Sequence, residues 1–152
     1  MKERACGPNS KRPEPFMSVK LVRQYTVFLP NIPGALSKFV ELFANEGVNI
    51  IGIASEIRDD SGVVRVAVDA DRKVSHLLTG AGFTTIETQM ISVDLQDKPG
   101  ELMRLAKLLG GHNINITTVY GTSDTGQTGR LLMNASDVEK AYEVLKAELG
   151  AK

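Results

Sequence analysis

Asn31-Ile-Pro-Gly-Ala-Leu36 occurs again 66 positions later as Asp97-Lys-Pro-Gly-Glu-Leu102, and the rest of the sequence repeats around these two motifs. Apolar residues and an asparagine recur at the same offset on both sides of the motif. The matched pairs are Val27 and Val93, Leu29 and Leu95, Leu42 and Leu108, Asn49 and Asn115, and Ile50 and Ile116. So many matches at one offset indicate an internal repeat. We therefore predict two copies of one structural unit.

An amphipathic helix is predicted directly after each motif. Pro33 and Pro99 fall near its first turn, where a missing N–H removes no helical hydrogen bond. Apolar residues then follow at the i, i+3, i+4, i+7 spacing that places them on one helix face. They are Leu36, Phe39, Val40 and Phe43 in the first copy and Leu102, Leu105, Ala106 and Leu109 in the second.

The remaining elements are predicted in the same order in both copies. A strand precedes the motif, and two strands joined by a hairpin and a second helix come after the first helix. The predicted ranges are residues 24–29, 48–57, 63–68 and 71–81 in the first copy and 90–95, 113–120, 130–134 and 136–149 in the second. Residues 83–88 are predicted to form a closing strand, which the second copy lacks. This βαββαβ order predicts an α+β fold of two ferredoxin-like repeats, with antiparallel sheets and helices on one face.

The composition excludes several classes of protein. Lys and Arg together number 18, as do Asp and Glu, so the chain has no basic surplus for binding nucleic acid. The apolar runs are too short to cross a bilayer, and the first 16 residues contain no apolar signal. Cys6 is the only cysteine, so no intrachain disulfide or thiolate cluster is expected. We predict a cytoplasmic protein that contacts neither nucleic acid nor membrane.

The predicted domain organisation has three parts. Residues 1–19 are expected to be a disordered leader, because they are rich in proline and mixed charges and contain few apolar residues. Either Met1 or Met17 can serve as the translation start. The first domain is predicted to span residues 20–88 and the second residues 89–152.

The repeated motif resembles that of the ACT domain. In that family a strand leads into Asn/Asp-x-Pro-Gly-x-Leu and a helix, and Gly-Val-Asn-Ile opens the next strand. Here the first copy reads Asn31-Ile-Pro-Gly-Ala-Leu36 with Gly47-Val-Asn-Ile50, and the second has Asn113-Ile-Asn-Ile116. The resemblance covers about residues 22–150. It implies a stand-alone tandem ACT protein, a regulatory module that binds an amino acid and acts on an unidentified regulated protein.

The motif suits a zwitterionic ligand. A helix N-terminus offers free N–H groups and a positive dipole end to a carboxylate, and a glycine without Cβ lets the ligand approach. An asparagine supplies both donors and an acceptor. We therefore predict that ligand-binding residues lie in both motifs and at both second-strand entries. They are Asn31, Ile32, Pro33, Gly34, Ala35, Leu36, Asn49 and Ile50, with Asp97, Lys98, Pro99, Gly100, Glu101, Leu102, Asn115 and Ile116.

Geometry predicts that the two asparagines of one copy bind different ligand molecules. Asn31 ends the first strand and Asn49 begins the second, and a helix of about 12 residues separates them by roughly 18 Å. By resemblance, they match two asparagines that bind serine in the ACT domain of phosphoglycerate dehydrogenase, where units meet through their second strands with the ligand at the seam. Leu29 departs from that pattern, in which a histidine is usual. The second copy departs further, because it has Asp97 in place of the asparagine. The carboxylate of Asp97 would repel that of a ligand.

A homodimer is predicted for two reasons. Side-by-side docking of the two units within one chain would stretch the connection at residues 83–91 to its limit of roughly 26–29 Å. Ile51, Ile53 and Ile57 are also expected to lie on the sheet face opposite the helices, where apolar side chains need cover. Pairing between two chains meets both conditions.

Several alternatives remain open at the level of sequence. Asn31 and Asp97 are also good helix caps, and the motif glycines would also let the helix pack close to the sheet. Asn49 and Asn115 are also typical of turns at a strand entry. No nucleophile and base stand together, so no enzyme activity is predicted, and no cofactor or metal is expected. The third strands lack the aromatic residues that RNA recognition needs. The alternative function is a partner-binding adaptor or assembly module without a ligand.

Overall fold

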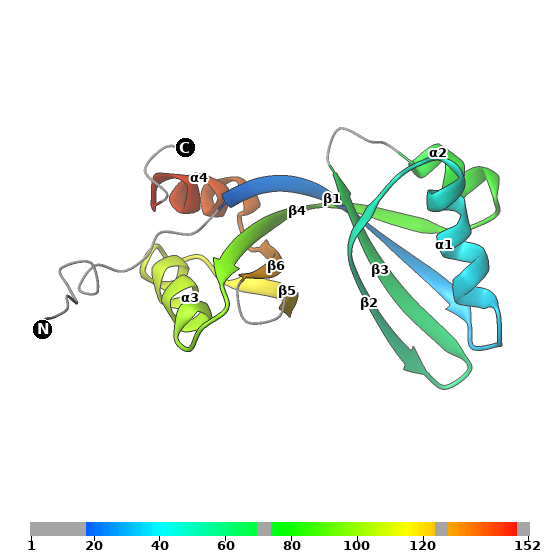
Figure 1. Ribbon diagram of the computed structural model, residues 1–152, viewed down its shortest axis with the longest axis horizontal. Helices are drawn as coiled ribbons and strands as arrows, with labels where there is room; N and C mark the ends of the chain where they lie inside the picture. The colour runs from blue at the N-terminus through cyan, green and yellow to red at the C-terminus, as the bar shows by residue number, and fades with distance from the viewer. Residues whose placement is uncertain (1–17, 70–73, 124–127, 149–152) are drawn as a thin grey trace, which may run out of the picture.

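The computed structural model describes residues 18–69, 74–123 and 128–148, which form six strands and four helices. The elements of the first copy lie at one end of the molecule and those of the second copy at the other (Figure 1). Their bounds in chain order are β1 Ser18–Pro30, α1 Ala35–Asn45, β2 Ile50–Arg58, β3 Ser61–Asp69, α2 Ser75–Gly80, β4 Thr85–Gln96, α3 Glu101–Gly111, β5 Ile116–Ser123, β6 Thr128–Ala135 and α4 Val138–Glu148.

All six strands belong to one antiparallel sheet with the order β2-β3-β1-β4-β6-β5. The first copy therefore has the ferredoxin-like order β2-β3-β1-β4, and the second has the same order, β5-β6-β4-β1. The two copies share the central strands β1 and β4. The predicted α+β fold of two ferredoxin-like repeats is confirmed.

The long central strands β1 and β4 each serve both copies. Residues 22–30 of β1 pair with β3, whereas residues 18–21 pair with β4 alone. Residues 91–96 of β4 pair with β6, whereas residues 85–90 pair with β1 alone. The strands predicted separately at residues 83–88 and 90–95 are thus one strand, which runs through the predicted domain boundary at residues 88 and 89. The place of the closing strand that the second copy lacks is taken by residues 18–21.

Each copy buries its own core between the helices and one face of the sheet. Phe39 contacts Phe43 and Phe83 edge to face, with ring centroids 5.3 and 5.5 Å apart, in the core of the first copy. Leu105, Leu109 and Leu145 fill the equivalent core of the second copy. Of the predicted apolar stripes, Phe39 and Phe43 of α1 and Leu105 and Leu109 of α3 are buried. Leu36, Leu102 and Ala106 are exposed, so the stripes extend beyond the buried faces. No helix among the residues described is both long and apolar enough to cross a membrane.

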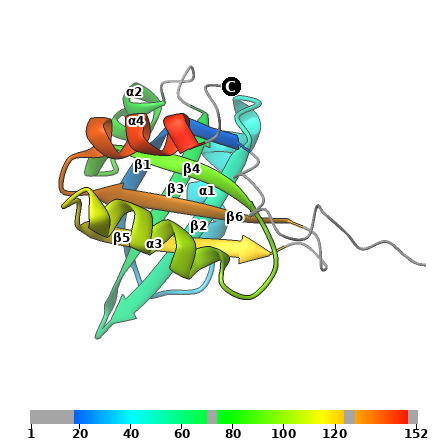
Figure 2. The same cartoon turned by 90° about the vertical axis from the view of Figure 1, so that its left-hand side faces the viewer.

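In each copy one face of the sheet is not covered by helices. These two faces pack against each other because the sheet curls (Figure 2). Val22, Met90 and Leu132 are buried there, and Ile51 packs against them. Tyr120 of β5 donates a hydrogen bond of 2.9 Å to Oε1 of the buried Gln24 of β1. Burial raises the pKa of Tyr120 to about 12, so its hydroxyl remains a donor well into the alkaline range. This third core joins the two copies within one chain.

The prediction that Ile51, Ile53 and Ile57 share one sheet face is wrong. A bulge between Ile50 and Gly52 shifts the alternation of β2 by one residue. Ile53 pairs with Val66 and Ile57 with Gly62, which places both on the helix-covered side, whereas Ile51 contacts the core between the copies. The sheet face that was expected to need a second chain as cover is therefore covered by the other copy of the same chain. Ile53 and Ile57 stay exposed along β2.

Candidate functional site

The two motif loops have nearly the same backbone conformation. Gly34 and Gly100 are the N-cap residues of α1 and α3, with φ of 88° and 92°. Residues other than glycine rarely adopt such angles. A Cβ built at either glycine would meet no atom within 4 Å. The glycines are therefore required for the turn, and the alternative that they allow close packing of helix and sheet is not supported.

The alternative that Asn31 and Asp97 cap the helices is wrong. Neither helix has a side-chain hydrogen bond at its cap. Asn31 instead donates its backbone N–H to the carbonyl of Asp60 at 3.0 Å, which ties the motif loop to the β2–β3 turn. Both motif side chains are exposed. They remain available for a role other than capping.

The first turn of each helix presents backbone N–H groups that the helix itself does not use. The first intrahelical bonds run from Lys38 to Gly34 at 3.1 Å and from Arg104 to Gly100 at 2.9 Å. The N–H groups of the two residues before each of these donors have no carbonyl acceptor inside an α-helix. α1 has no acidic residue in its first turn, whereas α3 has Glu101. A carboxylate in the first turn therefore compensates the positive end of the helix dipole in α3, whereas α1 has no such group.

A cavity of about 190 Å³ lies beside the first motif loop. The end of β1 with its loop, the start of α1, and the β2–β3 hairpin contribute to its walls. The lining residues are Leu29, Pro30, Asn31, Ile32, Ala35, Leu36, Ser55, Glu56, Ile57, Gly62 and Val64. We call it the first pocket. Most of its lining side chains are apolar.

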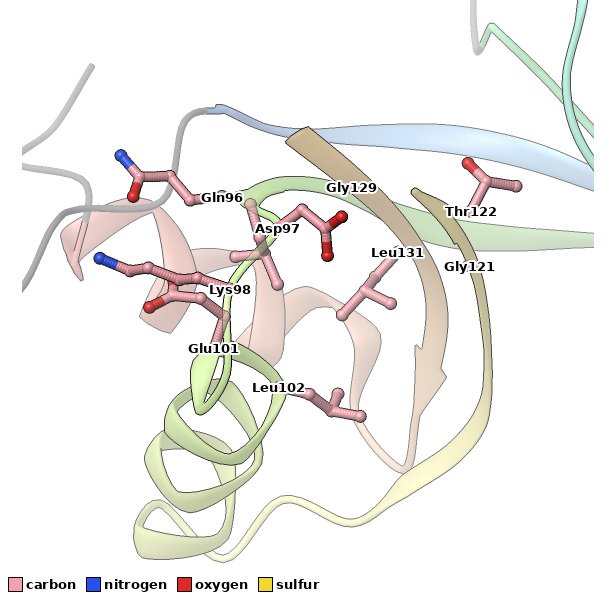
Figure 3. A pocket seen from close by; sticks show the side chains of 10 residues that line it. Gln96, Asp97, Lys98, Glu101, Leu102, Gly121, Thr122, Gly129 and Leu131 are labelled. Carbon is pink, nitrogen blue, oxygen red and sulfur yellow. The ribbon is translucent and has the colours of Figure 1, made fainter. Parts of the chain in front are cut away.

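A cavity of about 350 Å³ lies at the equivalent place in the second copy. The lining residues of this second pocket are Leu95, Gln96, Asp97, Lys98, Glu101, Leu102, Gly121, Thr122, Gly129 and Leu131. Asp97 and Leu102 point from the loop and α3 toward Leu131 of β6, whereas Lys98 points the other way (Figure 3). Glu101 is buried, and its carboxylate accepts a hydrogen bond of 2.7 Å from Arg104. The second pocket thus carries charged groups where the first is apolar.

The structure brings only part of the predicted site together. Four residues of each motif line the pockets, and the Pro-Gly pairs at 33–34 and 99–100 form the turns between them. Asn49 and Asn115 precede the second strands at the opposite end of the sheet: Ile50 pairs with Val68, while the motif end of β1 pairs with Ser61. Ile116 likewise pairs with Ala135, away from the second motif. Neither asparagine is among the lining residues of these two pockets.

Sequence reasoning missed the hairpin side of both pockets, among others Ser55 and Ile57 in the first copy and Gly121 and Thr122 in the second. A signal was present in the topology. In the predicted fold the first and second strands run in the same direction, so the end of the second strand lies at the same edge of the sheet as the motif loop. The described residues contain no group of three or more His, Cys, Asp or Glu side chains that could hold a metal ion.

Comparison with protein families finds one match. The model of the ACT domain pair matches residues 20–149. A solved structure from Bacteroides thetaiotaomicron is 23% identical, with a TM-score of 0.75 over 85% of this chain and 89% of that one. The ligand-free regulatory subunit of aspartate kinase from Thermus thermophilus is 14% identical, with a TM-score of 0.62 over 89% of this chain and 99% of that one. These likenesses concern the fold. No curated protein matches the chain.

Proposed function

Because this chain belongs to the ACT domain pair family, we propose that it is a regulatory protein that binds a small amino acid at its motif loops. The observation that carries the proposal is the pair of cavities at equivalent places in the two copies. In each, the motif loop, a helix N-terminus and the hairpin converge. Such concave sites with a few polar groups are typical of small-molecule binding.

The first pocket has the chemical groups that a zwitterion requires. The carboxylate would accept hydrogen bonds from the N–H groups of Leu36 and Ser37 at the start of α1, where no acidic side chain opposes it. The ammonium would meet the amide oxygen of Asn31 and the hydroxyl of Ser55, which both belong to lining residues. The second pocket would bind the same ligand more weakly, because the carboxylate of Asp97 repels that of the ligand.

A homodimer completes the proposed site. Within one chain Asn49 lies at the end of the sheet opposite the first pocket. β2 and β5 are the outer strands of the sheet, and Ile53, Ile57 and Val119 are exposed on them. An outer strand with exposed apolar side chains favours pairing with another chain. We propose that second strands of two chains meet, so that Asn49 of one chain faces a motif loop of the other. Light scattering should then report a dimer, and a monomer at all concentrations would contradict it.

The proposed role is regulation rather than catalysis. The Thermus thermophilus neighbour is itself a regulatory subunit, which supports a protein that senses a ligand and acts on another protein. The competing function is an adaptor that uses the fold for assembly without a ligand. The exposed apolar residues of β2 and β5 would also suit that function.

A thermal-shift screen of the amino acids distinguishes sensor from adaptor. A ligand that binds only the folded chain raises its melting temperature. We expect at least one small amino acid to do so, and we expect Asn31→Ala to reduce the shift. Asn45→Ala, at the exposed far end of α1, serves as the matched control and should keep the shift. If no amino acid stabilises the parent chain, the adaptor function is favoured.

A further inference from the structure

We infer that the first pocket selects an α-amino acid with a branched aliphatic side chain, whereas the second pocket does not. The inference rests on the proposed function and adds the class of ligand. It depends on which side chains surround each cavity, since the two share their backbone framework.

Three large apolar side chains around the first pocket are exposed to solvent. Ile32 is 60% exposed, Leu36 45% and Ile57 61%. They come from the loop, the helix and the hairpin, so they surround the cavity from three sides. Leu29 and Val64 form a buried apolar base behind them. Exposed apolar groups arranged in this way gain free energy when an apolar ligand covers them.

Four lining positions of the first pocket are polar in the second copy, whereas Leu29 and Leu36 correspond to Leu95 and Leu102. At the offset of 66 residues, Pro30 corresponds to Gln96, Ile32 to Lys98, Ala35 to Glu101 and Ile57 to Ser123. The glycine turns of the two copies have the same conformation, so the fold itself does not require apolar residues here. The apolar lining of the first pocket therefore concerns what occupies it.

The remaining groups of the first pocket restrict the ligand to a neutral side chain. Glu56 also lines the cavity, but its carboxylate pairs with Arg65 at 3.9 Å. The polar side chains left for the ligand are the uncharged Asn31 and Ser55, enough for its ammonium. A cationic or anionic ligand side chain would lose hydration among apolar groups without an opposite charge. A cavity of about 190 Å³ also lies below the roughly 300–1,000 Å³ of sites for drug-sized ligands.

Calorimetry on the full-length chain with a series of amino acids tests the inference. Each additional buried CH₂ group contributes about 0.8 kcal/mol, or roughly fourfold in affinity. Leucine has three more carbons than alanine, so we expect it to bind up to about 50-fold more tightly. Serine and lysine should bind no better than alanine. The 2-oxo acid with leucine's side chain should bind more weakly than leucine, because it lacks the ammonium.

A matched pair of variants locates the preference. Ile57→Ser introduces the residue that the second copy has at this position, and should lower the leucine-to-alanine affinity ratio by about tenfold. Ile53→Ser changes an exposed isoleucine on the same side of the same strand that does not line the pocket. It should leave the ratio unchanged. Because the readout is a ratio, a general loss of affinity or of dimer in either variant does not mimic the result.

The outcomes separate this inference from the proposed function. If no amino acid binds, the proposed function itself fails. If amino acids bind but leucine is no tighter than alanine, or if Ile57→Ser keeps the parent ratio, the aliphatic pocket is overturned while ligand binding stands. Equal binding of leucine and its 2-oxo acid would show that the pocket selects branched carboxylates rather than amino acids.

Discussion

The first and second motif loops have the same backbone and different surroundings. Gly34 and Gly100 adopt φ angles within a few degrees of each other, and both loops lead into an 11-residue helix. The cavity of the first copy is small and apolar, whereas that of the second is larger and contains Asp97 and Glu101. The residues that set the turn are thus the same in both copies, and the side chains that line the cavities differ. This difference indicates that the repeat preserves a framework and varies the lining of its cavity.

The largest expected effect comes from giving the second pocket a residue of the first. Gly121 occupies the position of Ser55, but a Cβ there would lie 2.7 Å from the backbone oxygen of Arg130 and 2.6 Å from Leu131 Cδ2. The backbone cannot move aside cheaply, so Gly121→Ser should destabilise the chain by about 3 kcal/mol. Urea denaturation measures this. Ser55→Gly, the reverse exchange in the first copy, should cost less, and equal effects would show that the two hairpins are interchangeable.

The next largest effect concerns the turn that both loops share. Gly34→Ala and Gly100→Ala should each destabilise the chain by about 1–2 kcal/mol, because each forces an L-residue into the left-handed region. Gly110→Ala is the control: it lies within α3, its φ is not positive, and a Cβ there has open space. That variant should be stabilised by about 0.5–1 kcal/mol. A large difference in destabilisation between Gly34→Ala and Gly100→Ala would show that the two loops are not structurally equivalent.

Exchanging the charges of the two loops should make their affinities converge. Asn31→Asp should weaken amino-acid binding at the first pocket by about tenfold, equivalent to about 1.4 kcal/mol, because a carboxylate then opposes that of the ligand. Asp97→Asn should strengthen binding at the second pocket. Calorimetry resolves the two sites. Unchanged affinities in both variants would mean that neither side chain lies near a ligand's carboxylate.

The smallest expected effect tests the contribution of a second chain. Asn49→Ala should reduce affinity by about fivefold, the effect of losing one hydrogen bond of about 1 kcal/mol. The effect should appear although Asn49 and the first pocket of the same chain lie at opposite ends of the sheet. Asn115→Ala is the comparison in the second copy. An Asn49→Ala variant that binds as tightly as the parent would show that the seam between chains does not include this side chain.

The sequence was sufficient to predict the features that depend on local pattern. The repeat, the helices α1 and α3, the hairpins and the motif loops all follow from periodicity and turn residues. The pairing of residues 18–21 with residues 91–94 of β4 was not predicted, because residues 18 and 19 were assigned to a disordered leader and the partners lie in the other copy. The bulge beside Gly52 was also missed, since the apolar pattern of Ile51, Ile53 and Ile57 reads as an unbroken alternation.

The candidate site was predictable to a similar extent. The motif residues around the pockets follow from resemblance and helix chemistry, but their hairpin walls depend on which strand ends share an edge. The position of Gly52 is a further example. A Cβ there would lie 2.0 Å from Leu132 Cδ1 of the other copy, so the glycine allows two distant strands to approach. Nothing in the sequence near Gly52 indicates that neighbour.

The two long central strands have a consequence for how the chain is made. During synthesis residues 18–21 emerge long before their partners at residues 91–94 of β4. The second copy therefore completes its sheet with a segment made earlier than its own residues, and that segment must remain available until then. A high contact order of this kind slows folding. Cutting the chain at residue 88 would leave each half with an unsatisfied strand edge, so we expect the two fragments to be unstable alone and to reassemble when mixed.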